Sequence, residues 1–367
     1  MRDVRASVAL RDMNPKDEKK DRRSVGWRRR DVLILALLCL FTVQCVRSTF
    51  FNNESSLDWS TYAAGTAAMP YQGRVGMVPV LRWAQRTGWM VRGAARYQAM
   101  MVAGARYREP VTVEKFASLL VGLAAAFVLL GYAVWYGRRR GAGLWWLPSV
   151  LLLEILTVSL VVRSEHTVWT PYDLPHTALF GLAVMCVFEG EWLAMLLLFV
   201  VDVPVRETSI FLLAVAAPFA FLDWRRLHGG LARVVALIVG MAAYWETWQV
   251  MIRRRFEHNP SDTGPRVATN LHEILFPHHW PQTLCIGGYL IIFIWLERRL
   301  LSSRERLLLY CTLICAPITL YYGVWGETRI WLEWSLPWAI LGAVEFERYL
   351  RQRNAVPDTM EERSLAG

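Results

Sequence analysis

The chain of 367 residues has little cysteine, and its cysteines are not arranged for a disulfide framework or a zinc site. No Cys-x-x-Cys spacing occurs, and no two cysteines pair within a water-exposed loop. Disulfide-stabilised secreted domains and zinc modules are therefore excluded, and no metal ligand is predicted. All six cysteines lie within or at the end of apolar segments: Cys39, Cys45, Cys186, Cys285, Cys311 and Cys315.

Residues 1–30 have almost no large apolar side chains and mix lysine, arginine, aspartate and glutamate. Such a composition cannot bury enough surface to order itself, so a disordered cytoplasmic tail is predicted here. The apolar run 32–46 follows the basic cluster 28–30, and no small-residue cleavage site comes after it. This pattern indicates a signal anchor rather than a removable signal peptide.

Apolar surface is what the chain has in excess, with 54% hydrophobic residues, 18 tryptophans and a mean hydropathy of +0.26. One soluble core of this size could not hide so much, so the predicted fold class is all-α, a polytopic helical membrane protein. Apolar stretches near the roughly 20 residues that cross a bilayer predict about ten transmembrane helices. They are 32–46, 114–136, 144–162, 175–189, 191–203, 206–222, 231–250, 281–297, 305–324 and 330–346.

The net charge of +10 comes from short basic clusters beside apolar segments. Positive-inside topology and anionic lipids account for such clusters, so membrane lipids are expected partners and nucleic acid is not. Both termini are predicted to be cytoplasmic, with a transmembrane domain over 31–347 and a second tail over 348–367. Two basic stretches on the predicted outer side, 82–108 and 253–255, do not follow this rule.

Two segments are suited to line a watery site on the outer side. The long loop 47–112 is too charged to span, and within it the stretch 78–105 alternates aromatic residues and methionine with arginine, which predicts one or two interfacial helices. The spans 191–203 and 206–222 form a short hairpin whose turn lies where lipid is otherwise expected. Irregular backbone at such depth is tolerated only beside protein or a water-filled cavity.

Charged residues in or at the rim of the apolar stretches are the candidates for function. A charge in hydrocarbon costs at least about 2.5 to 3.5 kcal/mol on insertion scales, so these side chains usually face a protein interior or a cavity. Glu154, in mid-span, has no partner that the sequence identifies. The others converge on the outer side of the predicted topology, although each alone also fits a helix cap or a structural ion pair.

Asp58 and Arg206 are the residues with the clearest chemistry. A carboxylate at a membrane boundary can take a proton from a hydroxyl or amide nucleophile or hold a metal, whereas the structural alternative for Asp58 is a helix N-cap. Arg206 begins a helix, where its guanidinium would fit a phosphate through two hydrogen bonds. The alternative for Arg206 is an internal pair with Glu207.

A third group of charges begins the final span. Arg329 and Glu333 are four residues apart and therefore share one helix face, and Glu327 precedes them. The pair is either structural or part of a site. Two carboxylates beside one arginine suit the recognition of sugar hydroxyls next to a phosphate.

Together these features resemble the GT-C superfamily of membrane glycosyltransferases, with a long first outer loop, juxtamembrane helices, an aspartate (Asp173) opening a later span and a broken helix pair. Within that pattern the chain is similar to bacterial multi-spanning proteins with a Pro-Tyr-Gln-x-Arg loop, an Arg-Glu-Thr hairpin and a late Glu-x-Arg-Ile element. These elements are residues 70–74, 206–208 and 327–330.

The resemblance implies transfer of a sugar from a polyprenyl-phosphate carrier to an acceptor on the outer face of a bacterial cytoplasmic membrane. It implies that Asp58 and Asp173 are catalytic, with Asp58 as the base, and it leaves the cofactor open. The first loop departs from the superfamily in having Glu54 and Asp58 four apart instead of a closely spaced acidic pair. The implied substrate-binding residues are Gln72, Arg74, His176, Arg206, Glu207, Glu327, Arg329 and Glu333.

Two alternatives share the same features. Intramembrane charges and a broken helix pair also describe a transporter or a flippase for lipid-linked glycans, although no inverted repeat is visible in the sequence. A polymerase or ligase of surface polysaccharide would use similar substrates and join whole oligosaccharides.

Overall fold

The computed structural model describes residues 27–52, 54–55, 57–103, 110–140, 143–161, 168–223, 230–261, 264–323 and 328–355. The chain forms two compact units, residues 1–38 and residues 39–367. The described part of the first unit, 27–38, contains the start of helix α1 (Arg29–Asn52). The rest of α1 and every later element belong to the second unit. Most of the predicted N-terminal tail (1–26) and the last part of the predicted C-terminal tail (356–367) lie outside the described residues.

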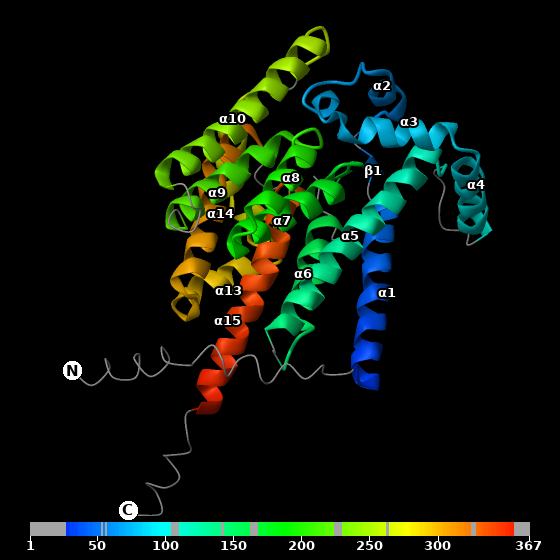
Figure 1. The fold of residues 1–367 in the computed structure, drawn as a ribbon. Helices are drawn as coiled ribbons and strands as arrows, with labels where there is room; N and C mark the ends of the chain where they lie inside the picture. The colour runs from blue at the N-terminus through cyan, green and yellow to red at the C-terminus, as the bar shows by residue number, and fades with distance from the viewer. Residues whose placement is uncertain are drawn as a thin grey trace, which may run out of the picture. The chain divides into compact units, whose positions relative to one another are not determined.

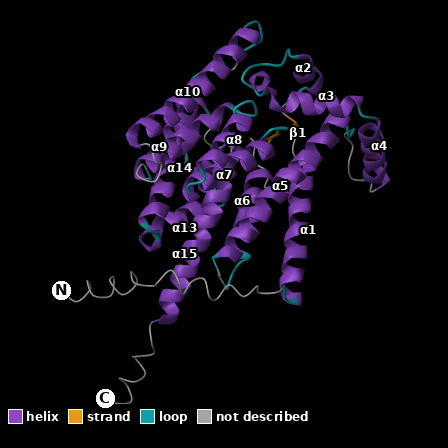
Figure 2. Cartoon of the chain, viewed as in Figure 1, coloured by secondary structure: helices purple, strands orange, loops and turns teal. Residues whose placement is uncertain are grey.

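The described residues are mostly helical, which confirms the all-α prediction (Figure 2). Two strands of two residues each, β1 (Glu54–Ser55) and β2 (Val168–Trp169), pair in parallel. An isolated bridge joins Met69 to Ser261. These short pairings connect the first predicted outer loop to segments that lie far away in the sequence.

The predicted interfacial stretch forms two helices, α3 and α4, as Figure 1 shows. Helix α3 has a strongly one-sided apolar pattern and buries Val78, Leu81 and Ala84, while Trp83 stays exposed. The elements of this region are α2 (Trp59–Ala64), η1 (Tyr71–Gly73), η2 (Val75–Met77), α3 (Val78–Arg86) and α4 (Gly88–Ala103).

The remaining elements form the helical bundle of the second unit (Figure 1). Its first half contains α5 (Val113–Arg139), α6 (Leu147–Leu160), α7 (Asp173–Glu189), α8 (Trp192–Asp202), η3 (Glu207–Ile210), α9 (Phe211–Leu222) and α10 (Gly230–Arg255). Its second half contains α11 (Val267–Leu275), η4 (Pro277–His279), α12 (Trp280–Leu284), α13 (Leu290–Leu296), η5 (Arg298–Leu300), α14 (Ser303–Tyr322), η6 (Thr328–Trp334) and α15 (Ser335–Ala355).

Three described helices are long and apolar enough to cross a membrane: residues 29–51 of α1, helix α5 and helix α10. Three further apolar stretches are shorter, at α6, α8 and residues 207–222. A helix rises about 1.5 Å per residue, so these shorter helices do not reach across a hydrocarbon core of about 30 Å. Within the described residues the structure thus supports three candidate membrane-spanning helices by length and composition, and it does not confirm the predicted number of ten.

Helix α7 lies at the centre of the bundle and packs against α5, α8, α9, α15 and η6. Its side chains are buried nearly all round, including Phe180, Val184 and Met185, as expected for a helix without a polar face. Full burial of each such side chain contributes about 1.5 to 3 kcal/mol. The first turn of α7 carries Asp173 and His176, so this packing fixes their position.

The predicted span 281–297 differs from the structure, in which α12 and α13 are separated by a turn. Gly287, Gly288 and Tyr289 all have positive φ angles in this turn, which an α-helix does not allow. A Cβ added to Gly288 would lie 2.1 Å from Oε2 of Glu154, so this carboxylate lies directly against the turn. The carboxylate of Glu154 therefore packs against the glycine turn.

Helix α15 continues to Ala355, beyond the predicted start of the tail at residue 348. Its last turns belong to a group of ion pairs that we name the basic-end cluster. This cluster joins the C-terminal ends of α5, α7, α9 and α15 to the N-terminal end of α14. Its members are Arg139, Arg140, Glu189, Asp223, Arg304, Glu305 and Arg348.

Candidate functional site

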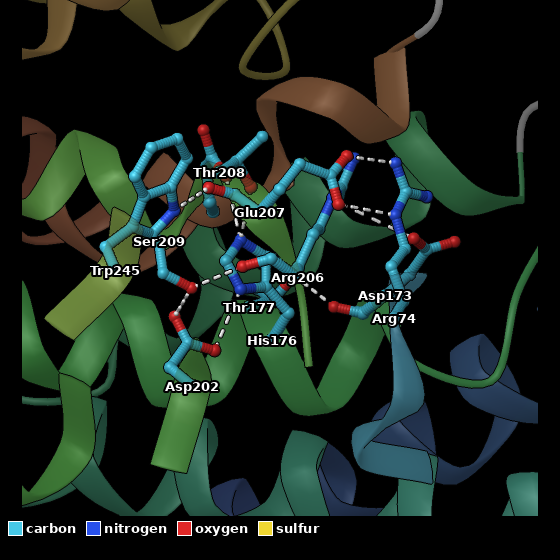
Figure 3. A network of polar contacts seen from close by, with 11 residues as sticks. Arg74, Asp173, His176, Thr177, Asp202, Arg206, Glu207, Thr208, Ser209 and Trp245 are labelled. Carbon is cyan, nitrogen blue, oxygen red and sulfur yellow. Dashed lines mark hydrogen bonds and ion pairs between the residues drawn. The ribbon is translucent and has the colours of Figure 1, made fainter. Parts of the chain in front are cut away.

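Polar side chains from four separate segments meet at the other end of the bundle, where α7 begins (Figure 3). The segments are the loop before η2, the first turn of α7, the turn that joins α8 to η3, and η6. We name this group the site cluster. Its members are Arg74, Tyr172, Asp173, His176, Asp202, Arg206, Glu207, Thr208, Ser209 and Glu333.

Asp202 closes the turn between α8 and η3. Its carbonyl oxygen accepts hydrogen bonds from the backbone N–H groups of Val205 (2.8 Å) and Arg206 (3.1 Å). Its Oδ2 accepts a hydrogen bond from the hydroxyl of Ser209 at 2.9 Å. Arg206 has an extended backbone between the two helices, which places its side chain at the tip of the hairpin. The predicted irregular turn is therefore present and held by a buried aspartate.

His176 lies inside the protein between two carboxylates. Its Nδ1 is 2.9 Å from Oδ1 of Asp202, and its Nε2 is 2.8 Å from Oε2 of Glu333. The hydroxyl oxygen of Thr208 is 3.0 Å from the same Nε2. His176 has no exposed surface, and the two carboxyl side chains are 2% and 1% exposed.

An aromatic layer lies beneath His176. The imidazole is 5.6 Å from the ring of Phe180, which makes an edge-to-face contact with Trp334 at 5.0 Å. Both aromatic rings are fully or almost fully buried. The ionisable groups therefore lie against buried aromatic side chains, where electrostatic interactions are stronger than in water.

Each guanidinium nitrogen of Arg74 donates a hydrogen bond to a protein group. Its Nε and Nη2 donate to the two carboxylate oxygens of Glu207 at 2.8 and 2.5 Å, and its Nη1 donates to the hydroxyl of Tyr172 at 2.9 Å. Burial by itself would lower the pKa of Arg74, but Glu207 and Tyr172 outweigh burial and hold this pKa well above its ordinary value. Arg74 therefore fastens the first outer loop to the hairpin.

Gln72 and Tyr62 shape the loop that carries Arg74. Oε1 of Gln72 accepts a hydrogen bond from the N–H of Ala67 at 3.1 Å, and its Nε2 donates to the carbonyl of Tyr62. The hydroxyl of Tyr62 donates to the carbonyl of Arg74. Burial raises the pKa of Tyr62, so this hydroxyl stays protonated as a donor. Gln72 is thus a buried loop residue in this structure.

Arg206 differs from Arg74 in its hydrogen bonding. It is only 3% exposed, yet its Nε and Nη1 make no hydrogen bond with any residue in the described ranges. Among the described residues its ion-pair partner is Asp173, whose Oδ1 lies 3.5 Å from Nη1. The other carboxylate oxygen of Asp173 accepts a hydrogen bond from the N–H of Thr170 at 3.2 Å. Two buried donors of Arg206 are therefore unsatisfied within the described residues.

The structure brings six of the sequence-predicted site residues into contact and leaves others apart. Asp58 is exposed just before α2, and its backbone carbonyl accepts from the N–H of Tyr62. Glu327 and the side chain of Arg329 lie outside the described residues. The six residues that meet are Arg74, Asp173, His176, Arg206, Glu207 and Glu333.

Asp202 and Tyr172 are site-cluster residues that the sequence-based list omits. Asp202 ends a short apolar helix four residues before Arg206, and a carboxylate at that place in a hairpin is itself a signal of a partner. Tyr172 comes directly before Asp173, and its contact with Arg74 spans 98 residues of sequence. No local pattern predicts so distant a pairing.

Within the described ranges no group of three or more His, Cys, Asp or Glu side chains is arranged to hold a metal ion. No family model matches the chain, and searches of curated proteins and of solved structures find no similar protein. Functional inference therefore starts from the geometry of the site cluster.

Proposed function

We propose that the chain is a polytopic membrane glycosyltransferase that resembles the GT-C superfamily and uses a sugar carried on a polyprenyl phosphate. The acceptor lies on the outer face of a cytoplasmic membrane. The observation that carries the proposal is Arg206, a buried guanidinium with two nitrogens that make no hydrogen bond within the described ranges.

A buried donor without a partner costs about 1 to 3 kcal/mol, and more when it is charged. Within the described residues, Arg206 bears this cost, whereas each guanidinium nitrogen of Arg74 donates to a protein group. A phosphate would accept hydrogen bonds from both nitrogens and match the planar guanidinium. The contrast supports a phosphate ligand in front of Arg206.

The apolar helices on either side of the turn support a lipid carrier. Helix α8 exposes Leu193, Leu197 and Val201, and α9 exposes Phe221 and Leu222. A polyprenyl chain can lie along such surfaces while its phosphate reaches the turn. In the proposed topology, with about ten spans and both termini cytoplasmic, the site cluster faces outward and the basic-end cluster faces the cytoplasm, as the positive-inside rule requires.

The residues of the site cluster take different roles in this proposal. Arg206 binds the phosphate and stabilises its negative charge as it departs. Asp173, opposite Arg206, accepts a hydrogen bond from a sugar hydroxyl. Arg74 and Glu207 hold the loop against the hairpin, and Asp58 is the proposed base for the acceptor.

The proposal predicts that Arg206→Gln weakens binding of a lipid phosphate about 10- to 100-fold, since a hydrogen bond to a charged group is worth about 1.5 to 3 kcal/mol. The measurement is the binding of a fluorescent polyprenyl phosphate to the purified full chain in nanodiscs. The matched polyprenol, which lacks the phosphate, should bind the variant and the wild type equally.

Arg254→Gln is the matched control, because it removes the same guanidinium group from an exposed position on α10. It should leave both affinities unchanged. Equal binding of polyprenyl phosphate to wild type and to Arg206→Gln would contradict the assignment of Arg206.

A transporter or flippase is the second candidate, because charges buried within a helical bundle at a broken hairpin also suit a substrate pathway. The two candidates differ in what happens to the substrate. An enzyme releases free polyprenyl phosphate from a lipid-linked sugar, whereas a flippase moves the intact lipid across a liposome membrane. A polymerase or ligase would give longer glycan products.

A further inference from the structure

His176 lies in a row between two carboxylates, those of Asp202 and Glu333. A neutral histidine cannot donate a hydrogen bond to both of them. A neutral imidazole has one N–H group and donates to one carboxylate only. The second contact would then place a nitrogen lone pair 2.8 or 2.9 Å from a carboxylate oxygen, which is repulsive. This row therefore needs a second proton, on the ring or on a carboxyl group.

Burial makes this requirement strict. All three side chains are at most 2% exposed, so water does not screen an unmatched contact. Ser209 holds the remaining oxygen of Asp202 at 2.9 Å, which fixes this carboxylate toward the imidazole. We name the three residues the proton array.

Thr208 provides the connection between the proton array and the substrate side. Its hydroxyl oxygen lies 3.0 Å from Nε2 of His176, and the residue is only half-buried. A hydroxyl accepts a hydrogen bond and donates one at the same time, so it can pass a proton along. Thr208 is two residues after Arg206 in the same turn, where the proposed phosphate binds.

We propose that the proton array is the general acid for the departing phosphate, with Thr208 as the group that delivers the proton. This inference rests on the proposed function and extends it to the leaving group. Thr208 is the catalytic residue among these four, because it alone of them faces the phosphate that Arg206 binds, and the three buried residues position and supply the proton.

Sugar transfer in this scheme breaks one carbon–oxygen bond and forms another. The bond between the anomeric carbon and the phosphate oxygen breaks, and its electron pair leaves with the phosphate. The acceptor oxygen forms the new bond to the anomeric carbon and gives up its own proton to water, which passes it to the exposed carboxylate of Asp58. The hydroxyl proton of Thr208 moves to the phosphate oxygen, while Thr208 takes the proton from Nε2 of His176. Water returns a proton to the array after release.

The first measurement tests the second proton without any substrate. In the full chain labelled with ¹⁵N-histidine, His176 should show two protonated nitrogens, or infrared spectra should show one protonated carboxyl group. Either signal should disappear in Glu333→Gln, which removes the need for the extra proton. A neutral ring with both carboxylates ionised in the wild type would overturn the inference.

The second measurement tests proton delivery during transfer. Lipid-linked sugars extracted from bacterial membranes serve as the donor, and released polyprenyl phosphate is followed by mass spectrometry. General acid catalysis contributes about 10²- to 10⁴-fold, so Thr208→Val should slow release at least about 100-fold, and Thr208→Ser should restore most of the rate. Thr312→Val removes a buried hydroxyl that only bonds its own helix, and is the matched control.

The outcomes separate the two proposals. A Thr208→Val variant that binds polyprenyl phosphate and releases it as fast as wild type overturns the acid role alone. A wild-type protein that binds polyprenyl phosphate but releases none from the donor overturns glycosyl transfer, and the acid role with it. Slow release in Thr208→Val and Glu333→Gln with unchanged binding supports both.

Discussion

The two ends of the helical bundle use arginine in opposite ways. In the basic-end cluster, Arg304 donates to both oxygens of Asp223 at 2.9 and 2.8 Å and to the carbonyl of Phe188 at 2.9 Å. In the site cluster, Arg206 is more deeply buried and yet leaves two nitrogens without a hydrogen bond in the described ranges. Arg304 is bonded to protein groups, and Arg206 is the arginine for which we propose a ligand.

The carboxylates show the same difference. The carboxylate of Glu305 accepts hydrogen bonds from Arg140 and Arg348. It also caps its own helix by accepting a hydrogen bond from the N–H of Ser302 at 2.7 Å. At the other end, Glu333 and Asp202 share one imidazole. At the basic end, several donors surround the one carboxylate of Glu305. In the site cluster, two carboxylates surround the one imidazole of His176. The two clusters are therefore similar in burial and differ in how far their hydrogen-bonding groups are satisfied within the described residues.

The largest effect on stability is expected from Glu305→Gln. The substitution removes a buried charge that joins α14 to α5 and α15, and it leaves two arginines without their partner. Breaking a buried ion pair costs about 3 to 5 kcal/mol, and the partial exposure of both arginines reduces this to about 2 to 3 kcal/mol here. Thermal unfolding of the detergent-purified chain, followed by tryptophan fluorescence, measures the loss.

Glu257→Gln serves as the control, since Glu257 is exposed and should leave the unfolding temperature unchanged. Binding of polyprenyl phosphate at a temperature where Glu305→Gln is folded should match wild type. A variant as stable as wild type would mean that the basic-end cluster does not hold the helix ends together.

A smaller loss, about 1.5 kcal/mol, is expected from Arg304→Lys. Lysine keeps the charge opposite Asp223 but has no planar fork, so it cannot form both bonds to the carboxylate and the bond to the Phe188 carbonyl together. Thermal unfolding is again the measurement. Unchanged stability would show that charge alone acts at this position and would remove the contrast with Arg206.

The sequence predicts the outline of the fold because the signals are local. Apolar periodicity places a helix in nearly every predicted span, and alternating tryptophan and arginine predict α3 and α4. The charged residues flanking the hairpin also lead to the site cluster, since a charge beside an apolar run needs a partner. Which partner it finds depends on packing over long separations, such as the 157 residues between His176 and Glu333.

The sequence fails where backbone geometry decides the structure. The span 281–297 appears continuous in hydropathy, but Gly287 and Gly288 adopt positive φ and break it against Glu154. The sequence singles out Arg206 because it begins a helix, but it does not predict how the hydrogen bonding of Arg206 differs from that of Arg74. In the structure each guanidinium nitrogen of Arg74 donates to a protein group, whereas Nε and Nη1 of Arg206 make no hydrogen bond within the described residues.

The smallest effect on stability, and the sharpest test of the comparison, is expected from Arg206→Lys. Lysine keeps a positive charge opposite Asp173. The substitution removes the guanidinium group, whose Nε and Nη1 make no hydrogen bond within the described ranges. The free energy of unfolding should therefore change by less than about 0.5 kcal/mol, against the larger loss in Arg304→Lys. Affinity for polyprenyl phosphate should nevertheless fall about tenfold, since an ammonium does not bind a phosphate through two parallel bonds. If Arg206→Lys unfolds as easily as Arg304→Lys and binds the lipid phosphate like wild type, then Arg206 is a structural residue and both ends of the bundle use arginine alike.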